Sequence, residues 1–262
     1  MNVRRIYAVL LQEVFLTVHS LEVIMDVFLF PTVNIVIFGL LAVYLSGTET
    51  SETPKFFFLG MLLWQVVGIT SYSVAVGSMW NIWSRNLSNM FIAPLRVSEY
   101  VSALFLSGCA KAIMLLALGM GLSAWLFDFN VLEVGFPALA LAFVIFAFFG
   151  FALAILTIGI IFRFGTRLAA LSWSLPWLFQ PLSAAFFPIS ALPHAMQLIA
   201  KALAPTYAFE MVRYSLAFHS IRWDFLGWGL ALDFLYCIVF TVAFQYLYER
   251  SRDSGQFAKN ES

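Results

Sequence analysis

The sequence predicts an all-α, polytopic membrane protein with six transmembrane helices, an amino-terminal amphipathic helix and short re-entrant helices between spans five and six. The first observation is composition: 62% of the 262 residues are hydrophobic and 11% are charged, with a mean hydropathy of +0.92, whereas soluble domains are about 25% charged. The second is a series of apolar stretches long enough to cross a bilayer. We therefore expect residues 1–262 to form a single transmembrane domain.

The amino-terminal stretch, residues 1–26, has the pattern of an amphipathic helix. Arg5, Gln12, His19 and Asp26 recur every seven residues, which places them on one face of a helix, with apolar side chains opposite. The polar residues also interrupt the apolar core that a cleaved signal peptide requires. We expect a helix that lies in the plane of the lipid headgroups.

Six segments have the length and apolarity of transmembrane helices, since about 20 apolar residues cross the roughly 30 Å hydrocarbon core. They are residues 28–46, 56–79, 98–127, 134–162, 168–187 and 225–248. The third and fourth are long enough to tilt or to continue beyond the membrane.

The distribution of basic residues predicts the orientation of these spans. On one side lie Arg4, Arg5, Arg85, Arg96, Arg163, Arg167, Arg250, Arg252 and Lys259; on the other lie Lys55, Lys201, Arg213 and Arg222. Lys and Arg accumulate on the cytoplasmic side of membrane proteins. Both termini are therefore expected in the cytoplasm.

Residues 80–97 form the polar segment between the second and third spans, which this orientation places in the cytoplasm. As a helix, the segment would carry apolar side chains on one side and polar ones on the other until Pro94 ends it. Two interpretations remain open: an interfacial loop anchored by tryptophans, or a docking surface for a cytoplasmic partner. The residues of the docking interpretation are Trp83, Arg85, Asn86, Leu87, Met90, Phe91 and Pro94.

Residues 188–223, between the fifth and sixth spans, are too apolar for a solvated loop. Pro188, Pro193 and Pro205 divide them into short pieces with helical periodicity. Non-helical backbone at membrane depth is tolerated where protein covers it or where it faces water. We expect two short helices that dip into the outer leaflet.

Two stretches carry a resemblance to a known family. The stretch "FFPISALPHAMQLIAKALAPTYAFEMVR", with its Phe-Pro, Leu-Pro, Pro-Thr and Glu-x-x-Arg elements, resembles the signature region of ABC-2 type permeases, the membrane subunits of one class of ABC exporters. "NLSNMFIAPLRVSEY" is similar to the first cytoplasmic coupling region of that family. One departure is Ala204, where the family often has a second proline.

This resemblance implies a subunit that moves a substrate outward through a bacterial cytoplasmic (inner) membrane, paired with a second copy of itself or a paralogous permease. A separate cytoplasmic ABC ATPase would hold ATP and Mg and dock on residues 83–94. The turn at residues 162–167 would offer a second contact through Arg163 and Arg167. The outer segment, residues 188–213, would cap the exit. A polysaccharide, lipid-linked or other amphipathic substrate is implied.

The residues themselves indicate that ATP binds elsewhere. A phosphate-binding loop needs Gly-Lys followed by Ser or Thr, but each of the four lysines follows Pro or Ala. We expect no cofactor on this chain, no catalytic residues, no metal ligands and no nucleic-acid partner. Membrane lipid is the remaining expected partner.

Two groups of residues inside the spans are candidates for functional roles. Lys111 is expected deep in the third span, where an ionisable side chain usually faces the bundle interior, and Asp233 is the nearest acidic candidate at its level. Trp173, Trp177 and Gln180 of the fifth span would either pack against other helices or line a translocation path at a dimer axis.

Two alternative functions remain open on the sequence. An ion-gradient-driven secondary transporter would be expected to show internal repeats and acidic residues near mid-membrane. A polytopic enzyme that modifies lipids would need clustered polar groups near an interface, for which Glu210 and Arg213 are a candidate pair. Their spacing more simply predicts a local salt bridge.

Overall fold

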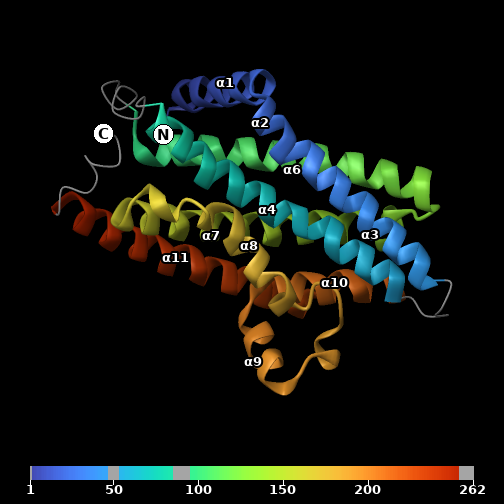
Figure 1. The fold of residues 1–262 in the computed structure, drawn as a ribbon. Coiled ribbons are helices and arrows are strands. Elements are labelled where there is room, and N and C mark those ends of the chain that lie inside the picture. Colours follow the sequence, from blue (N-terminus) through green and yellow to red (C-terminus); the bar gives the residue numbers. More distant parts are fainter. Residues whose placement is uncertain (1, 47–52, 85–94, 254–262) are drawn as a thin grey trace.

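The computed structural model describes residues 2–46, 53–84 and 95–253, which form an elongated bundle of helices (Figure 1). The helices are α1 (Val3–His19), α2 (Leu21–Ile24), the π-helical turn η1 (Met25–Leu29), α3 (Phe30–Ser46), α4 (Thr53–Trp83), α6 (Val97–Phe127), α7 (Phe136–Phe164), α8 (Leu171–Phe179), α9 (His194–Ala202), α10 (Ala204–Phe218) and α11 (Trp223–Asp253). The fold is all-α in the part of the chain that the structure describes.

Five helical stretches in the described residues are long and apolar enough to cross a membrane. They are Leu21–Leu45, Lys55–Trp83, Val97–Phe127, Phe136–Phe164 and Trp223–Ser251. The chain is therefore a polytopic helical membrane protein. The predicted span at 56–79 continues as helix to Trp83, so the start of the expected 80–97 segment belongs to α4.

The fifth predicted span, residues 168–187, is not confirmed as a continuous helix. Its helical core is α8, nine residues long, and the 3₁₀ turn Pro181–Ser183 follows it. Pro181 has no N–H to donate and its ring excludes the carbonyl of residue 177 from helical geometry. Ala184 then adopts a left-handed conformation, with φ of 55°, so the chain turns where the predicted span would continue.

Helix α4 is the centre of the bundle. In its apolar stretch, 94% of residues are buried, against 17% in α11. Glycines let the neighbouring helices approach it closely: a Cβ on Gly150 of α7 would lie 2.7 Å from the Val67 carbonyl oxygen, and one on Gly108 would lie 3.0 Å from Ser73 Cβ. Close approach through small residues is how helices pack in lipid, where apolar side chains gain little by leaving the lipid tails.

Helix α1 packs beside the first half of α6 and runs parallel to it. The Asn2 amide donates to Glu99 Oε1 at 2.7 Å, and further along Glu13 pairs with Lys111. The apolar side chains Tyr7, Phe15 and others on the opposite side are exposed. The amphipathic helix is thus present with its polar side toward the bundle, whereas its placement in the headgroup plane stays a prediction.

The two short helices predicted within residues 188–223 are α9 and α10. Pro193 precedes α9 and Pro205 occupies the first turn of α10, as expected for a residue that begins helices and cannot continue them. In Figure 1, α9 stands away from the long helices, whereas α10 lies alongside α11. Their depth in a membrane stays a prediction.

Gly60 offers a test of this packing. A Cβ on Gly60 of α4 would overlap the Ala185 carbonyl oxygen, whereas one on Gly121 of α6 would meet nothing within 4 Å. We expect Gly60→Ala to lower the free energy of unfolding by about 1–3 kcal/mol and Gly121→Ala to leave it nearly unchanged. Thermal unfolding midpoints in one detergent measure both, and equal midpoints would contradict the packing described.

Candidate functional site: a groove between α3, α4 and α8

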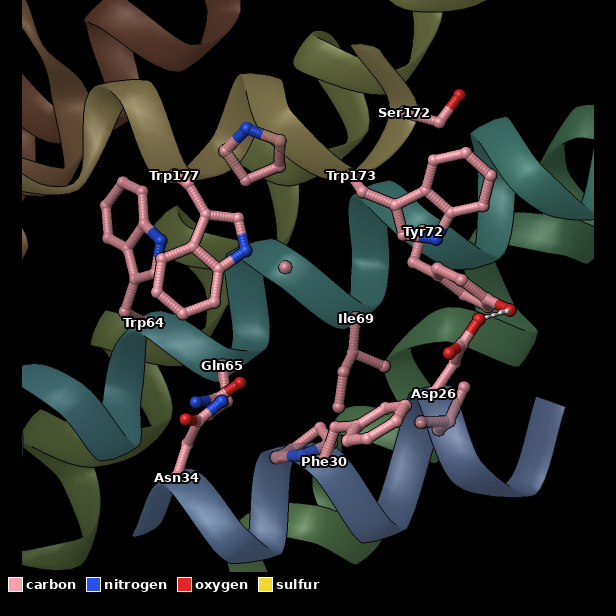
Figure 2. A pocket seen from close by; sticks show the side chains of 14 residues that line it. Asp26, Phe30, Asn34, Trp64, Gln65, Ile69, Tyr72, Ser172, Trp173 and Trp177 are labelled. Atoms are coloured by element: carbon pink, nitrogen blue, oxygen red, sulfur yellow. Dashed lines mark hydrogen bonds between the residues drawn. The ribbon is translucent and has the colours of Figure 1, made fainter. Parts of the chain in front are cut away.

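A groove of about 230 Å³ lies where η1 and α3 on one side and α8 on the other both pack against α4. Helical spacing builds each wall, because residues three or four apart share a helix face. Gln65, Gly68 and Tyr72 line it from α4, and Trp173 and Trp177 line it from α8. Figure 2 shows the α8 side chains facing those of α3, with the α4 side chains between them.

Both flanking walls contain irregular helix. At η1 the Phe30 amide bonds to the Met25 carbonyl, five residues back, and Pro31 follows directly. Because Pro31 cannot donate to residue 27, the widened turn is consistent with the proline. Opposite, α8 contains Pro176 and ends after nine residues. Interrupted helices at membrane depth are typical of substrate and ion sites in transporters.

The groove contains polar groups at two places. Tyr72 donates its hydroxyl to Asp26 Oδ2 at 2.8 Å. Further along, the side-chain amides of Asn34 from α3 and Gln65 from α4 also line the groove (Figure 2), and no hydrogen bond to either amide is present in the described part of the chain. The groove therefore offers unused donors and acceptors beside aromatic rings.

Two of the three residues predicted for a translocation path line this groove. Trp173 is 39% exposed and Trp177 is 53% exposed. Gln180 lies elsewhere: its side chain is buried and donates to Met61 Sδ of α4 at 3.6 Å. Sequence reasoning missed Asn34 and Gln65, although an amide within an apolar run is itself a signal of a buried polar site.

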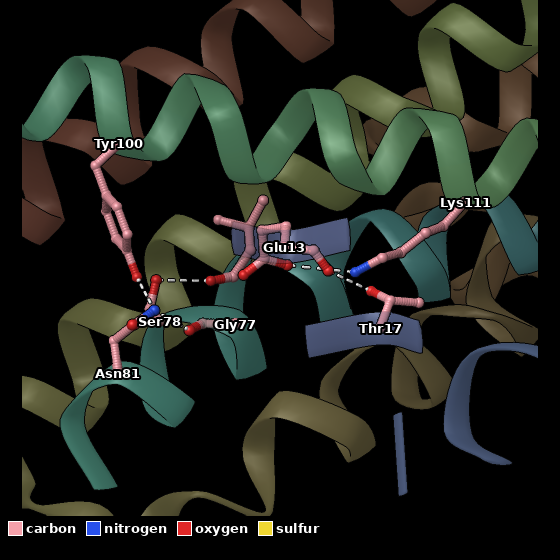
Figure 3. A network of polar contacts seen from close by, with 8 residues as sticks. Glu13, Thr17, Gly77, Ser78, Asn81, Tyr100 and Lys111 are labelled. Atoms are coloured by element: carbon pink, nitrogen blue, oxygen red, sulfur yellow. Dashed lines mark hydrogen bonds and ion pairs between the residues drawn. The ribbon is translucent and has the colours of Figure 1, made fainter. Parts of the chain in front are cut away.

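A second polar cluster joins α1 to α4 and α6 (Figure 3). Lys111 Nζ lies 3.3 Å from Glu13 Oε2, and both side chains are almost fully buried. The expected pairing of Lys111 with Asp233 is wrong, because α1 brings an acidic residue to α6 from the amino terminus. Burial raises the pKa of the Glu13 carboxyl, and the charge of Lys111 opposes that rise.

Two amide side chains extend this cluster toward one end of the bundle. Gln12 Nε2 donates to Asn81 Oδ1 at 2.9 Å, and Asn81 Nδ2 donates to the Tyr100 hydroxyl oxygen at 2.8 Å. Hydrogen bonds that are partly or fully buried therefore join three helices, α1, α4 and α6.

Asp233 of α11 is buried, at 3% exposed, and does not line the groove. Neither of its carboxylate oxygens has a hydrogen-bond partner among the described residues. An acidic side chain buried in a membrane span is costly and usually functional.

The Glu-x-x-Arg element of α10 binds the backbone of the turn that follows α8. Arg213 pairs with Glu210 at 3.0 Å, which confirms the predicted local salt bridge, and it donates to the carbonyls of Ala184 and Ala185. Glu210 Oε1 also accepts the Ile189 amide at 3.0 Å. Burial lowers the pKa of Arg213, and Glu210 opposes that shift.

The predicted docking residues lie largely outside the described residues. Trp83 ends α4, is 44% exposed and packs edge-on against Trp80. The other predicted docking residues lie outside the described residues: Arg85, Asn86, Leu87, Met90, Phe91 and Pro94.

The second predicted contact lies at the end of α7. Arg163 stacks over the Phe164 ring, and the exposed Arg167 donates to the Phe164 carbonyl at 3.1 Å. Both lie at the end of the bundle that also contains the amino-terminal end of α1 and the carboxy-terminal end of α11 (Figure 1).

No protein-family model and no curated protein matches the chain. Within residues 2–46, 53–84 and 95–253, no three His, Cys, Asp or Glu side chains are placed to hold a metal ion.

The Glu13–Lys111 pair gives a prediction with a defined pH dependence. Lys111→Met leaves a buried carboxylate unpaired, and we expect a loss of about 3–5 kcal/mol of stability near neutral pH. Burial raises the folded-state pKa of Glu13, so the loss should be small at low pH, where the carboxyl is protonated, and grow as pH rises through that pKa.

Thermal unfolding across pH measures this effect, with Glu13→Leu/Lys111→Met as the matched variant. The double variant removes both charges and should recover most of the lost stability, without the pH dependence. A single variant as stable as the parent at all pH values would show that the pair does not hold α1.

Proposed function

We propose that the chain is the permease subunit of an ATP-driven ABC-2 type exporter, which moves a polysaccharide, lipid-linked or other amphipathic substrate outward. The observation that supports a transport function is the groove between two interrupted helices in a bundle with several candidate membrane spans. The resemblance of the outer segment and of residues 86–100 to ABC-2 permeases supports the ATP-driven class.

The arrangement of the outer segment also supports this proposal. Two residues of the motif that carries the resemblance, Glu210 and Arg213, form hydrogen bonds to the backbone of the turn that follows α8. Movement of the outer helices would thereby be coupled to α8, which carries Trp173 and Trp177 into the groove. Coupling of this kind requires two states that differ in these contacts.

The partners and the location are part of the same proposal. A cytoplasmic ABC ATPase would bind ATP and Mg and dock on residues 83–94, with Arg163 and Arg167 as a second contact. A second copy or a paralogous permease would complete the transporter. The chain would lie in the bacterial cytoplasmic (inner) membrane with both termini in the cytoplasm, and it would not itself be an enzyme.

Co-purification tests the proposal. The tagged protein, isolated in mild detergent, should retain a stoichiometric partner with a phosphate-binding loop and ATPase activity, and Leu87→Asp/Met90→Asp should lose both. Leu132→Asp is the control, since Leu132 is 52% exposed in the turn between α6 and α7, at the opposite end. Absence of an ATPase from the parent protein would overturn the proposal.

A second candidate function is an ion-gradient-driven secondary transporter, which the buried Asp233 favours, because neither of its carboxylate oxygens has a hydrogen-bond partner among the described residues. Protonation would remove the cost of its buried charge, as a proton-coupled transporter requires.

Proton flux distinguishes the two functions. In proteoliposomes under an imposed pH gradient, the exporter proposal expects no substrate-independent proton entry and no effect of Asp233→Asn on ATPase activity beyond about twofold, or about 0.4 kcal/mol. A gradient-driven transporter should admit protons and lose that flux in Asp233→Asn.

A further inference from the structure

We infer that the groove between α3, α4 and α8 binds a neutral, hydroxylated ring, such as the sugar unit of a glycan, and selects against phosphorylated or otherwise anionic groups. This inference names the substrate class of the proposed function and rests on that function for the direction of movement. Binding itself is argued from the groove alone.

The charges around the groove exclude an anion. Asp26 is the ionisable acid in the wall, and the described residues that line the groove include no Lys or Arg. A phosphate would enter a partly buried space with no cation to compensate its desolvation and with a carboxylate at one end. Proteins that bind phosphate place cationic or backbone N–H donors there.

The polar groups suit hydroxyls. The amides of Asn34 and Gln65 each provide donors and an acceptor, and they line the groove from two packed helices, α3 and α4 (Figure 2). Asp26 uses one carboxylate oxygen to accept the Tyr72 hydroxyl, and the other has no hydrogen-bond partner in the described part of the chain. A hydroxyl both donates and accepts, so a polyhydroxylated ring matches this set.

The apolar wall suits the flat side of such a ring. Trp173 and Trp177 are one helical turn apart on α8 and both are partly exposed. The negative face of an aromatic ring attracts the weakly positive C–H groups that line a sugar face. A groove of about 230 Å³ accommodates one or two ring units rather than a folded polymer.

A larger side chain at Gly68 would occupy part of the groove and so provides a test of ligand binding there. A Cβ on Gly68 would meet nothing within 4 Å, and Gly68 lies on the groove floor. Gly121 of α6 has the same freedom and does not line the groove. Gly68→Leu therefore adds a side chain to the groove wall at a position where the new Cβ meets no other atom, and Gly121→Leu is its matched control.

The experiment is saturation-transfer NMR on the purified chain in phosphatidylcholine nanodiscs, without ATP or an ATPase. The probes are maltotriose, octyl glucoside below its micellar concentration, and glucose 1-phosphate. We expect saturation of sugar-ring protons for a neutral probe. Its apparent affinity should fall about tenfold, equivalent to about 1.4 kcal/mol, in Gly68→Leu and in Trp177→Ala, and stay unchanged in Gly121→Leu.

Each outcome decides the inference. Binding of both neutral probes supports a free oligosaccharide as ligand, and binding of octyl glucoside alone, sensitive to Gly68→Leu, supports a glycolipid headgroup. Equal binding of glucose 1-phosphate, insensitivity to Gly68→Leu, or no binding of either neutral probe would overturn the inference. Sugar binding without a co-purifying ATPase would overturn only the proposed exporter, and an ATPase complex without sugar binding would overturn only the ligand class.

Discussion

The backbone of a membrane protein must satisfy its hydrogen bonds within the protein, because the hydrocarbon core supplies no water to replace them. The long helices meet this constraint by themselves. Two segments interrupt the long regular helices: the π-helical turn η1 and the short, proline-containing helix α8. Both flank the groove. In the turn that follows α8, the Ala184 and Ala185 carbonyls accept hydrogen bonds from Arg213. A charged side chain of α10 thus provides hydrogen-bond donors to backbone carbonyls of the non-helical turn that follows α8.

Close packing around α4 determines where the groove lies. At Gly60 and opposite Gly150, the backbones of α4 and a neighbouring segment approach so closely that a methyl group would overlap them. At Gly68 this contact is lost and space opens toward α3 and α8. The groove is therefore a local gap in an otherwise dense interior, lined by Trp173 and Trp177 and supplied with amides from Asn34 and Gln65.

Charge burial has two different outcomes in this bundle. Lys111 is compensated by Glu13, which ties α1 to the first half of α6 and turns the polar side of α1 inward. Removal of one partner alone leaves an uncompensated charge and is the costly change. Asp233 has no such partner among the described residues, so its role differs from that of the structural pair. The Glu13–Lys111 pair stabilises the docking of α1 on α6. At Asp233, protonation would remove the cost of the buried charge.

Local properties of the sequence determined that the chain spans a membrane, where its five long described helices lie and that two short helices precede α11, because hydropathy, helical period and proline positions act over one or two turns. They also indicated Trp173 and Trp177. Tertiary structure alone decided that Lys111 pairs with Glu13 rather than Asp233, that Gln180 packs on Met61, and that Asn34 and Gln65 line the same groove. These pairings join residues far apart in sequence, and which helix faces which depends on packing that no local pattern specifies.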